Sequence, residues 1–184
     1  MTRSLAVTLN ALSLYAVALV LAAAFAAQLL LHELPCPLCL LQRIQFAVLA
    51  IGPILNIRFG PRPSHYALSL LAAAAGFAFS TRQVLLHITP GDAGFGTALF
   101  GYHYYTWALI GFATAIILLA VILLFDRQFE PDREPTVAPP AYAAVAVWLA
   151  IGLTALNVAS TLLECGFGAC AENPVVYELL KRGG

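Results

Sequence analysis

Five apolar segments, each long enough or nearly long enough to cross a bilayer, constrain this chain more than any other feature. They cover approximately residues 10–31, 40–57, 66–87, 104–125 and 141–163. A bilayer core about 30 Å thick needs roughly 20 helical residues. With 61% hydrophobic and 10% charged residues, the chain is too apolar for a soluble domain. The sequence therefore predicts an all-α, multi-pass membrane protein that forms one domain over residues 1–184.

The loops predict how these segments are oriented. Basic residues in short loops favour the cytoplasmic side of a membrane. If the five segments alternate in direction, the following arginines fall on one side: Arg3, Arg58, Arg62, Arg127 and Arg133. We therefore expect a cytoplasmic N-terminus, a periplasmic C-terminus and a periplasmic, cysteine-bearing tail over residues 164–184. Net charge is zero and no basic run is present, so a nucleic-acid partner is not expected.

Four cysteines form two close pairs, Cys36 with Cys39 and Cys165 with Cys170. By number alone they suit a zinc site or a dithiol/disulfide system equally. Both pairs fall on the predicted periplasmic side, where disulfides form and persist. The spacing is a weak match to zinc ligands, so we predict no metal site. Two alternatives remain: a membrane-anchored metal- or haem-binding protein, and a structural membrane protein stapled by two disulfides.

The first pair lies in the stretch "CPLCLLQR", at the predicted start of the second helix. Free N–H groups and the helix dipole favour an anion at a helix start, which stabilises a thiolate, and Pro37 suits the first helical turn. Arg43 follows Cys39 by four residues, so the two side chains share a helix face. A buried guanidinium needs an anionic or accepting partner. The candidates are the Cys39 thiolate, a bound electron acceptor and lipid phosphates.

The same stretch resembles the first-loop signature of the bacterial disulfide bond formation protein B (DsbB-like) family. The resemblance implies a four-helix bundle in the bacterial inner membrane that oxidises a periplasmic thioredoxin-fold (DsbA-like) protein and reduces a quinone, ubiquinone or menaquinone. It implies redox roles for Cys36 and Cys39 and a quinone contact for Arg43. The stretch "STRQVLLH" is similar to the end of the family's third helix, which implies that His87 lies near the quinone and that Arg82 is a second contact or a structural partner.

The second pair departs from the family's best-known pattern, which places it between the third and fourth helices. Here that loop has no cysteine, and "ECGFGAC" follows a fifth helix instead. The extra helix returns the chain to the predicted periplasmic side, so we expect Cys165 and Cys170 to be catalytic too. Gly166 and Gly168 make the intervening turn compliant. We expect electrons to pass from a dithiol protein to Cys165–Cys170, then to Cys36–Cys39 and then to quinone.

Overall fold

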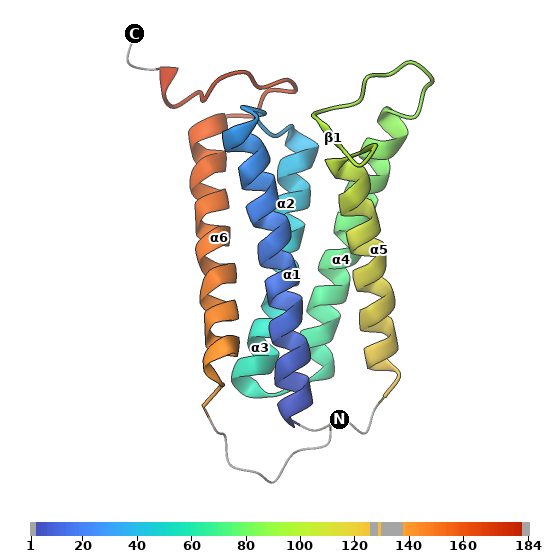
Figure 1. Cartoon of the computed structure of the whole chain (residues 1–184), viewed down its shortest axis with the longest axis vertical. Coiled ribbons are helices and arrows are strands. Elements are labelled where there is room, and N and C mark those ends of the chain that lie inside the picture. Colours follow the sequence, from blue (N-terminus) through green and yellow to red (C-terminus); the bar gives the residue numbers. More distant parts are fainter. Residues whose placement is uncertain (1–2, 126–128, 130–137, 182–184) are drawn as a thin grey trace.

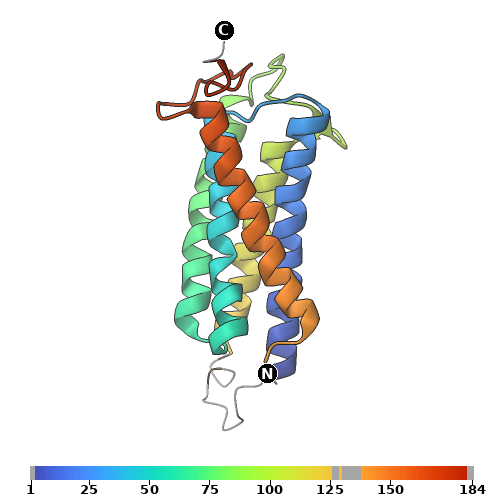
Figure 2. The same cartoon turned by 90° about the vertical axis from the view of Figure 1, so that its left-hand side faces the viewer.

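The computed structural model describes residues 3–125, 129 and 138–181, and the helices of these residues form one bundle (Figures 1 and 2). The helices are α1 (Arg3–Leu30), α2 (Pro37–Leu49), α3 (Ile51–Phe59), α4 (Pro63–Leu86), α5 (Tyr104–Leu123) and α6 (Ala141–Cys165). A short antiparallel hairpin, β1 (Ala98–Leu99) and β2 (Tyr102–His103), precedes α5. The described residues contain five helical spans long and apolar enough to cross a membrane, with α2 and α3 counted as one. The prediction of an all-α membrane fold is confirmed.

The helices pack as two groups joined by α2 and α3. The α1 helix packs against α6 and α3, whereas α4 packs against α5, α2 and α3. Outward-facing apolar side chains stay exposed, including Leu30 (76%), Trp148 (72%) and Leu124 (78%). Exposed apolar surface of this extent is typical of helices that face lipid. Arg127 and Arg133, on which part of the predicted orientation rests, lie outside the described residues.

The break between α2 and α3 follows from Pro53. Proline has no N–H, so the carbonyl of Leu49, four residues earlier, loses its helical partner. The Ser69 hydroxyl on α4 donates to that carbonyl at 2.8 Å and replaces the missing bond. Gly52 lets α3 and α4 approach each other, because a Cβ at this position would overlap Ser69 and the backbone of His65 on α4.

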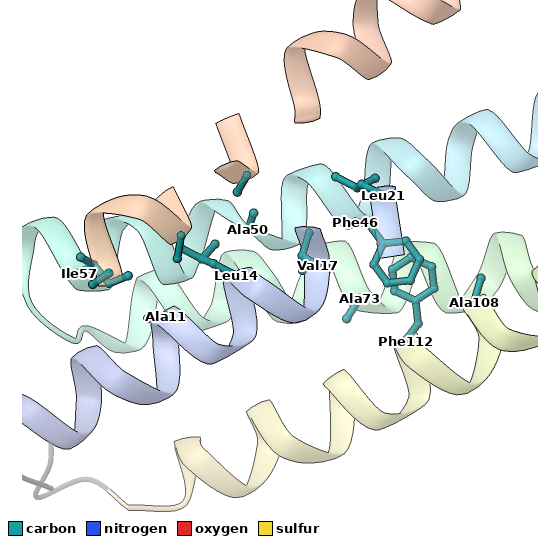
Figure 3. Close-up of a cluster of buried hydrophobic side chains, with 13 residues drawn as sticks. Ala11, Leu14, Val17, Leu21, Phe46, Ala50, Ile57, Ala73, Ala108 and Phe112 are labelled. Atoms are coloured by element: carbon teal, nitrogen blue, oxygen red, sulfur yellow. The ribbon is translucent and has the colours of Figure 1, made fainter. Parts of the chain in front are cut away.

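Small side chains let the helices pack closely around a few large ones, as is common in membrane bundles. The rings of Phe46 and Phe112 stack in the core with their centroids 4.1 Å apart (Figure 3). Gly76 on α4 lies against the Phe112 ring, so a larger residue there would clash. The alanines Ala143, Ala146 and Ala150 line the buried face of α6.

Both cysteine pairs lie at the same end of the bundle, because α2 begins and α6 ends there (Figures 1 and 2). The opposite end is held by a buried polar network. Asn10 on α1 donates from Nδ2 to the Tyr66 hydroxyl at 3.2 Å, and its side-chain Oδ1 accepts from Asn56 Nδ2 at 3.0 Å. His65 contacts the side-chain oxygen of Asn56 at 2.9 Å. The histidine thus has a structural partner far from the cysteines.

Candidate functional site

The first cysteine pair forms the start of α2. Cys36 is the N-cap residue, with an extended backbone, and its sulfur accepts a hydrogen bond from the Cys39 N–H at 3.1 Å. Pro37 occupies the first helical turn, as predicted. The two cysteines are joined in a disulfide, and Cys36 is only 7% exposed. The helix start therefore supplies a backbone donor to the sulfur, which favours negative charge there.

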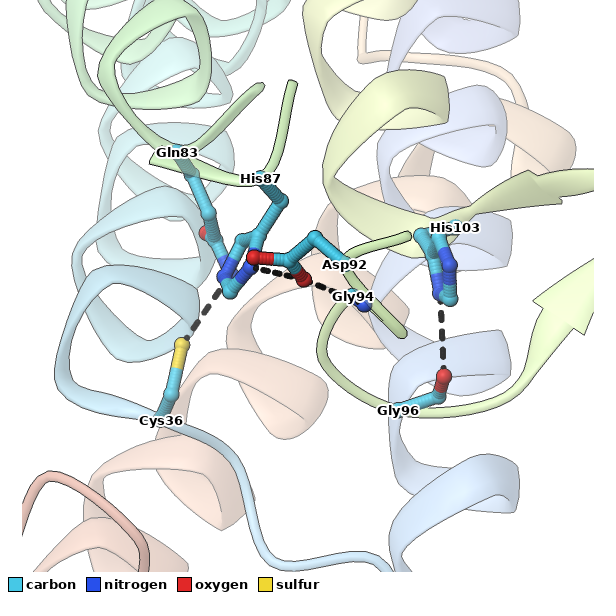
Figure 4. Close-up of polar contacts among 7 residues, drawn as sticks. All are labelled: Cys36, Gln83, His87, Asp92, Gly94, Gly96 and His103. Carbon is cyan, nitrogen blue, oxygen red and sulfur yellow. Dashed lines mark hydrogen bonds and ion pairs between the residues drawn. The ribbon is translucent and has the colours of Figure 1, made fainter. Parts of the chain in front are cut away.

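Two glutamines lie behind this disulfide. Gln83 on α4 is 1% exposed, and its Nε2 atom lies 3.2 Å from the Cys36 sulfur and 3.4 Å from the Cys39 sulfur (Figure 4). Its Oε1 atom accepts from Nε2 of Gln42 on α2 at 2.8 Å. Gln42, near the start of the second predicted segment, is thus buried against α4.

Arg43 turns away from the sulfurs and bonds to α1. Its Nη1 donates to Gln28 Oε1 at 2.7 Å, and its Nη2 donates to the Ala24 carbonyl at 2.9 Å. The guanidinium also lies over the Phe25 ring, 5.8 Å from its centroid. The observed acceptors are therefore an amide and a backbone carbonyl of α1, which were not among the partners considered from the sequence.

Cys39 and Arg43 nevertheless line one cavity of about 230 Å³. Much of its wall is apolar and comes from α1, α2, α5 and the loop before α5, including Val20, Leu21, Ala24, Phe46, Phe95 and Ala108. Two further lining residues are exposed on the outer surface, Trp107 (39%) and Leu99 (46%). The cavity therefore reaches from the first disulfide to the apolar outer face of the bundle.

The second cysteine pair closes the end of α6. Cys165 is the last residue of the helix and forms a disulfide with Cys170. Gly166 ends the helix with φ 64°, a conformation that glycine adopts readily. Phe167, at the tip of the loop, is 92% exposed. Cys165 itself is buried, 8% exposed, and Cys170 is half-buried, so the second disulfide lies beneath an exposed loop.

The tail folds back onto the end of α6. The Glu178 N–H donates to the Glu164 carbonyl, and the Leu179 N–H donates to the Leu163 carbonyl, both at 3.1 Å. The Tyr177 hydroxyl accepts from Gln28 Nε2 at 3.0 Å. The tail is therefore hydrogen-bonded to the same glutamine that accepts from Arg43.

The Glu164 side chain is buried, 2% exposed, next to the second disulfide. Neither of its carboxylate oxygens has a hydrogen-bond partner in the part of the chain that the structure describes. Arg43 and Glu164 interact electrostatically. The fifth span thus brings an acidic group close to the arginine of the first pair.

The other two predicted quinone contacts lie elsewhere. His87, at the end of α4, donates from Nδ1 to Asp92 at 3.0 Å (Figure 4) and stacks on Tyr105, with ring centroids 5.5 Å apart. It does not line the cavity, although Tyr105 does. Arg82 is exposed on another face of α4, in a shallow site beside Phe77. The structure brings Cys36, Cys39 and Arg43 together, and leaves His87 and Arg82 outside this group.

The loop that carries Asp92 is held by hydrogen bonds at its turns. Asp92 accepts from the Gly94 N–H at 2.7 Å, and this bond together with the His87 side chain lowers the pKa of the carboxyl group. His103 donates from Nδ1 to the Gly96 carbonyl at 2.9 Å (Figure 4). Among the described residues, no three His, Cys, Asp or Glu side chains gather as a metal site would require.

Sequence reasoning did not assign roles to Gln28, Gln83, Glu164 or Tyr177. The first three are polar side chains within apolar helices, and such residues usually face protein and contribute to function. Their presence in the segments was therefore a usable signal. Their common position beside Arg43 and the first disulfide depends on how α1, α4 and α6 pack, which local sequence does not encode.

These features first define a class: an all-α, multi-pass membrane protein with two disulfides at one end of its bundle, the first beside an apolar cavity. Residues 6–95 match the family model described as disulfide bond formation protein DsbB. The chain is similar to this family over just under half of its length, and the match includes Cys36, Cys39 and Arg43 but neither Cys165 nor Cys170.

Several similar proteins carry the name Disulfide bond formation protein B. The one from Xanthomonas axonopodis pv. citri is 42% identical over 77 residues, which are 39% of this chain and 45% of the relative. Those from Xanthomonas oryzae pv. oryzae and Xanthomonas campestris pv. campestris are 40% identical over 77 residues with the same coverage. The chain thus spans about half the length of the curated relatives that it matches. No solved structure is a significant match to the sequence.

Proposed function

We propose that the protein is a membrane thiol–disulfide oxidoreductase that oxidises a periplasmic dithiol protein and passes the electrons to a membrane quinone. The observation that carries this proposal is that Cys39 and Arg43 line one apolar cavity beside a disulfide. A disulfide that only staples a loop needs neither the cavity nor the buried arginine. The likeness to proteins named for disulfide bond formation supports the same role.

The cavity suits the ring of a quinone. At about 230 Å³ it is smaller than the pockets that hold whole drug-sized ligands, so an isoprenoid tail would remain among the lipids. Arg43 supplies a cation in the cavity wall, where it can donate to a quinone carbonyl oxygen. A bound quinone, ubiquinone or menaquinone, would accept two electrons and two protons.

The two disulfides would act in sequence. A thioredoxin-fold, DsbA-like dithiol protein attacks the Cys165–Cys170 disulfide, of which Cys170 is the more exposed member, and leaves oxidised, while Cys165 and Cys170 become thiols. These thiols reduce Cys36–Cys39 through a mixed disulfide between the two pairs, and the first pair returns to its disulfide when two electrons leave for the acceptor. One substrate disulfide therefore forms for each pair of electrons.

This proposal requires that both pairs face the periplasm, where disulfides persist. Their location at one end of the bundle is compatible with that orientation, and so are the arginines Arg58 and Arg62 at the other end. We therefore place the protein in the bacterial inner membrane, with its N-terminus in the cytoplasm.

Single serine replacements of the four cysteines test the proposal. Purified protein in lipid nanodiscs is given a reduced thioredoxin-fold partner and ubiquinone or menaquinone, and quinone reduction is followed by absorbance. We expect each replacement to abolish turnover driven by the partner. With a small dithiol such as dithiothreitol in place of the partner, the Cys165→Ser and Cys170→Ser variants should retain turnover, because the small reductant can reach the first pair directly.

Two results would overturn parts of this scheme. Full turnover of the partner by Cys165→Ser or Cys170→Ser would exclude the second pair from the electron path. Turnover by Cys39→Ser would remove the first pair from quinone reduction. Wild-type protein that is inert with both quinones while both disulfides stay intact would instead identify them as structural staples.

A further inference from the structure

The Gln83 side chain is the direct side-chain donor to the first disulfide. Its Nε2 lies within hydrogen-bond distance of both sulfurs, 3.2 Å from Cys36 and 3.4 Å from Cys39. The side chain is 1% exposed, so water cannot take over this role if the amide is removed. Arg43, by contrast, donates to Gln28 and to the Ala24 carbonyl, both on α1.

The orientation of the Gln83 amide is set by Gln42. Because Gln42 Nε2 donates to Gln83 Oε1 at 2.8 Å, the oxygen of Gln83 is occupied and its NH₂ group faces the two sulfurs. Figure 4 shows the contact with Cys36. The reverse orientation would place two donors against each other and an oxygen against sulfur. Gln42 lies on α2, the helix that begins at the two cysteines. Its hydrogen bond therefore holds the Gln83 amide at a fixed position relative to their sulfurs.

A donor at this position does not treat the oxidation states equally. Sulfur in a disulfide is a weak acceptor, whereas a thiolate is charged, and hydrogen bonds to charged acceptors are roughly twice as strong as neutral ones. The Gln83 amide therefore stabilises the reduced, ionised pair more than the disulfide. The Cys39 N–H acts in the same direction on Cys36.

We propose that Gln83 is a catalytic residue of the Cys36–Cys39 exchange, and that Gln42 positions it. When two electrons enter, the S–S bond breaks, one proton is taken up, and the pair becomes a thiol and a thiolate that accepts from the Gln83 N–H. When two electrons leave, the S–S bond re-forms and that proton is released. The place of this step in electron transfer to quinone rests on the proposed function, whereas the effect on the sulfurs does not.

The test compares the full-length wild-type protein with Gln83→Met, which keeps the length of the side chain and removes the donor. Each protein is equilibrated in glutathione buffers, quenched by alkylation, and the Cys36–Cys39 peptide is quantified by mass spectrometry. We expect Gln83→Met to favour the disulfide by about tenfold, which corresponds to about 30 mV for a two-electron couple. The pH midpoint for alkylation of the reduced pair should rise as well.

Gln45→Met is the matched control, since no hydrogen bond among the described residues joins Gln45 to either sulfur, and it should leave both measurements unchanged. If Gln83→Met does not fold, Gln42→Met should give a smaller shift in the same direction, because it frees the amide to turn. Unchanged values in a folded Gln83→Met protein, or an equal shift in Gln45→Met, would overturn the inference. A wild-type protein that does not reduce quinone would overturn the proposed function and would leave the Gln83 shift measurable.

Discussion

Arg43 on α2 donates a hydrogen bond to Gln28 on α1, with Nη1 and Oε1 2.7 Å apart. The amide nitrogen of the same glutamine donates to the Ser160 hydroxyl at 2.8 Å and to the Tyr177 hydroxyl at 3.0 Å. One side chain therefore joins the cavity arginine to α6 and to the tail that follows the second disulfide. The fifth span supports the site of the first pair as well as carrying the second.

Replacing Gln28 with leucine should weaken quinone binding more than turnover. The change removes the acceptor that holds one arm of Arg43, and a hydrogen bond to a charged group contributes about 1.5–3 kcal/mol. If the misplaced guanidinium loses part of its contact with the quinone, KM should rise about tenfold, with kcat changed less. Steady-state quinone reduction measures both constants. Gln45→Leu provides the control, and an unchanged KM in Gln28→Leu would show that Arg43 does not need this partner.

Replacing Arg43 with methionine should lower kcat/KM for quinone reduction by about 100-fold, or roughly 2.7 kcal/mol of transition-state stabilisation. The cation in the cavity wall is lost, while the length of the side chain is largely kept. Arg43→Lys should recover only part of the activity, because an ammonium group lacks the planar fork that reaches both Gln28 and Ala24. Arg58→Met, at the other end of the bundle, should match the wild type. Equal kinetics for Arg43→Met and Arg58→Met would contradict the assignment.

Much of this fold could be predicted because membrane helices leave a strong local signal. The third predicted segment, 66–87, became α4 at Pro63–Leu86, and the fifth, 141–163, became α6 at Ala141–Cys165. The helix break after Leu49 was harder to predict from the sequence. A proline such as Pro53 interrupts helical hydrogen bonds, but its effect here also depends on the Ser69 hydroxyl of α4. That hydroxyl donates to the Leu49 carbonyl in place of the missing N–H, which is a tertiary contact.

The site was predictable where its residues are close in sequence. Cys39 and Arg43 lie one helical turn apart, and the structure places both in one cavity wall. Arg82 and His87 were assigned from a local likeness, and whether they contact a quinone stays a prediction. Gln83, one residue after Arg82, points inward to the sulfurs while Arg82 points outward. Which of two neighbouring polar residues faces the bundle depends on the rotation of α4, and local sequence did not settle that rotation.

Removing the Tyr177 hydroxyl should loosen the tail. Tyr177→Phe abolishes the 3.0 Å bond to Gln28 but keeps the ring, so the backbone bonds to the end of α6 remain. We expect faster hydrogen exchange at the Glu178 and Leu179 amides, which donate to α6 carbonyls. Tyr142→Phe, at the other end of α6, is the control. Unchanged exchange in Tyr177→Phe would show that the backbone bonds alone hold the tail.

Acid should release the loop that Asp92 closes. The pKa of Asp92 is lowered from its ordinary value of 3.8, first by the Gly94 N–H and then by His87. Its stabilising effect is therefore fully present above about pH 3.8 and is lost as the pH falls through the lower folded-state value. Protection of the Gly94 amide against hydrogen exchange, relative to its intrinsic rate, should decline in that range. In Asp92→Asn the protection should no longer depend on pH there, and a decline of equal size would assign the effect to another group.

The Ser69 hydroxyl should contribute to the free energy of unfolding only when Pro53 is present. Ser69→Ala leaves the partly buried Leu49 carbonyl without its partner, and such a loss costs about 1–3 kcal/mol. In a Pro53→Ala background, residue 53 regains an N–H that can bond to the same carbonyl, so Ser69→Ala should then cost less than about 0.5 kcal/mol. Unfolding in mixed detergent micelles, followed by circular dichroism, gives the four free energies of this cycle. Ser13→Ala, which removes a bond within α1 at 2.8 Å, is the control. Equal costs of Ser69→Ala in both backgrounds would show that the serine does not compensate for the proline.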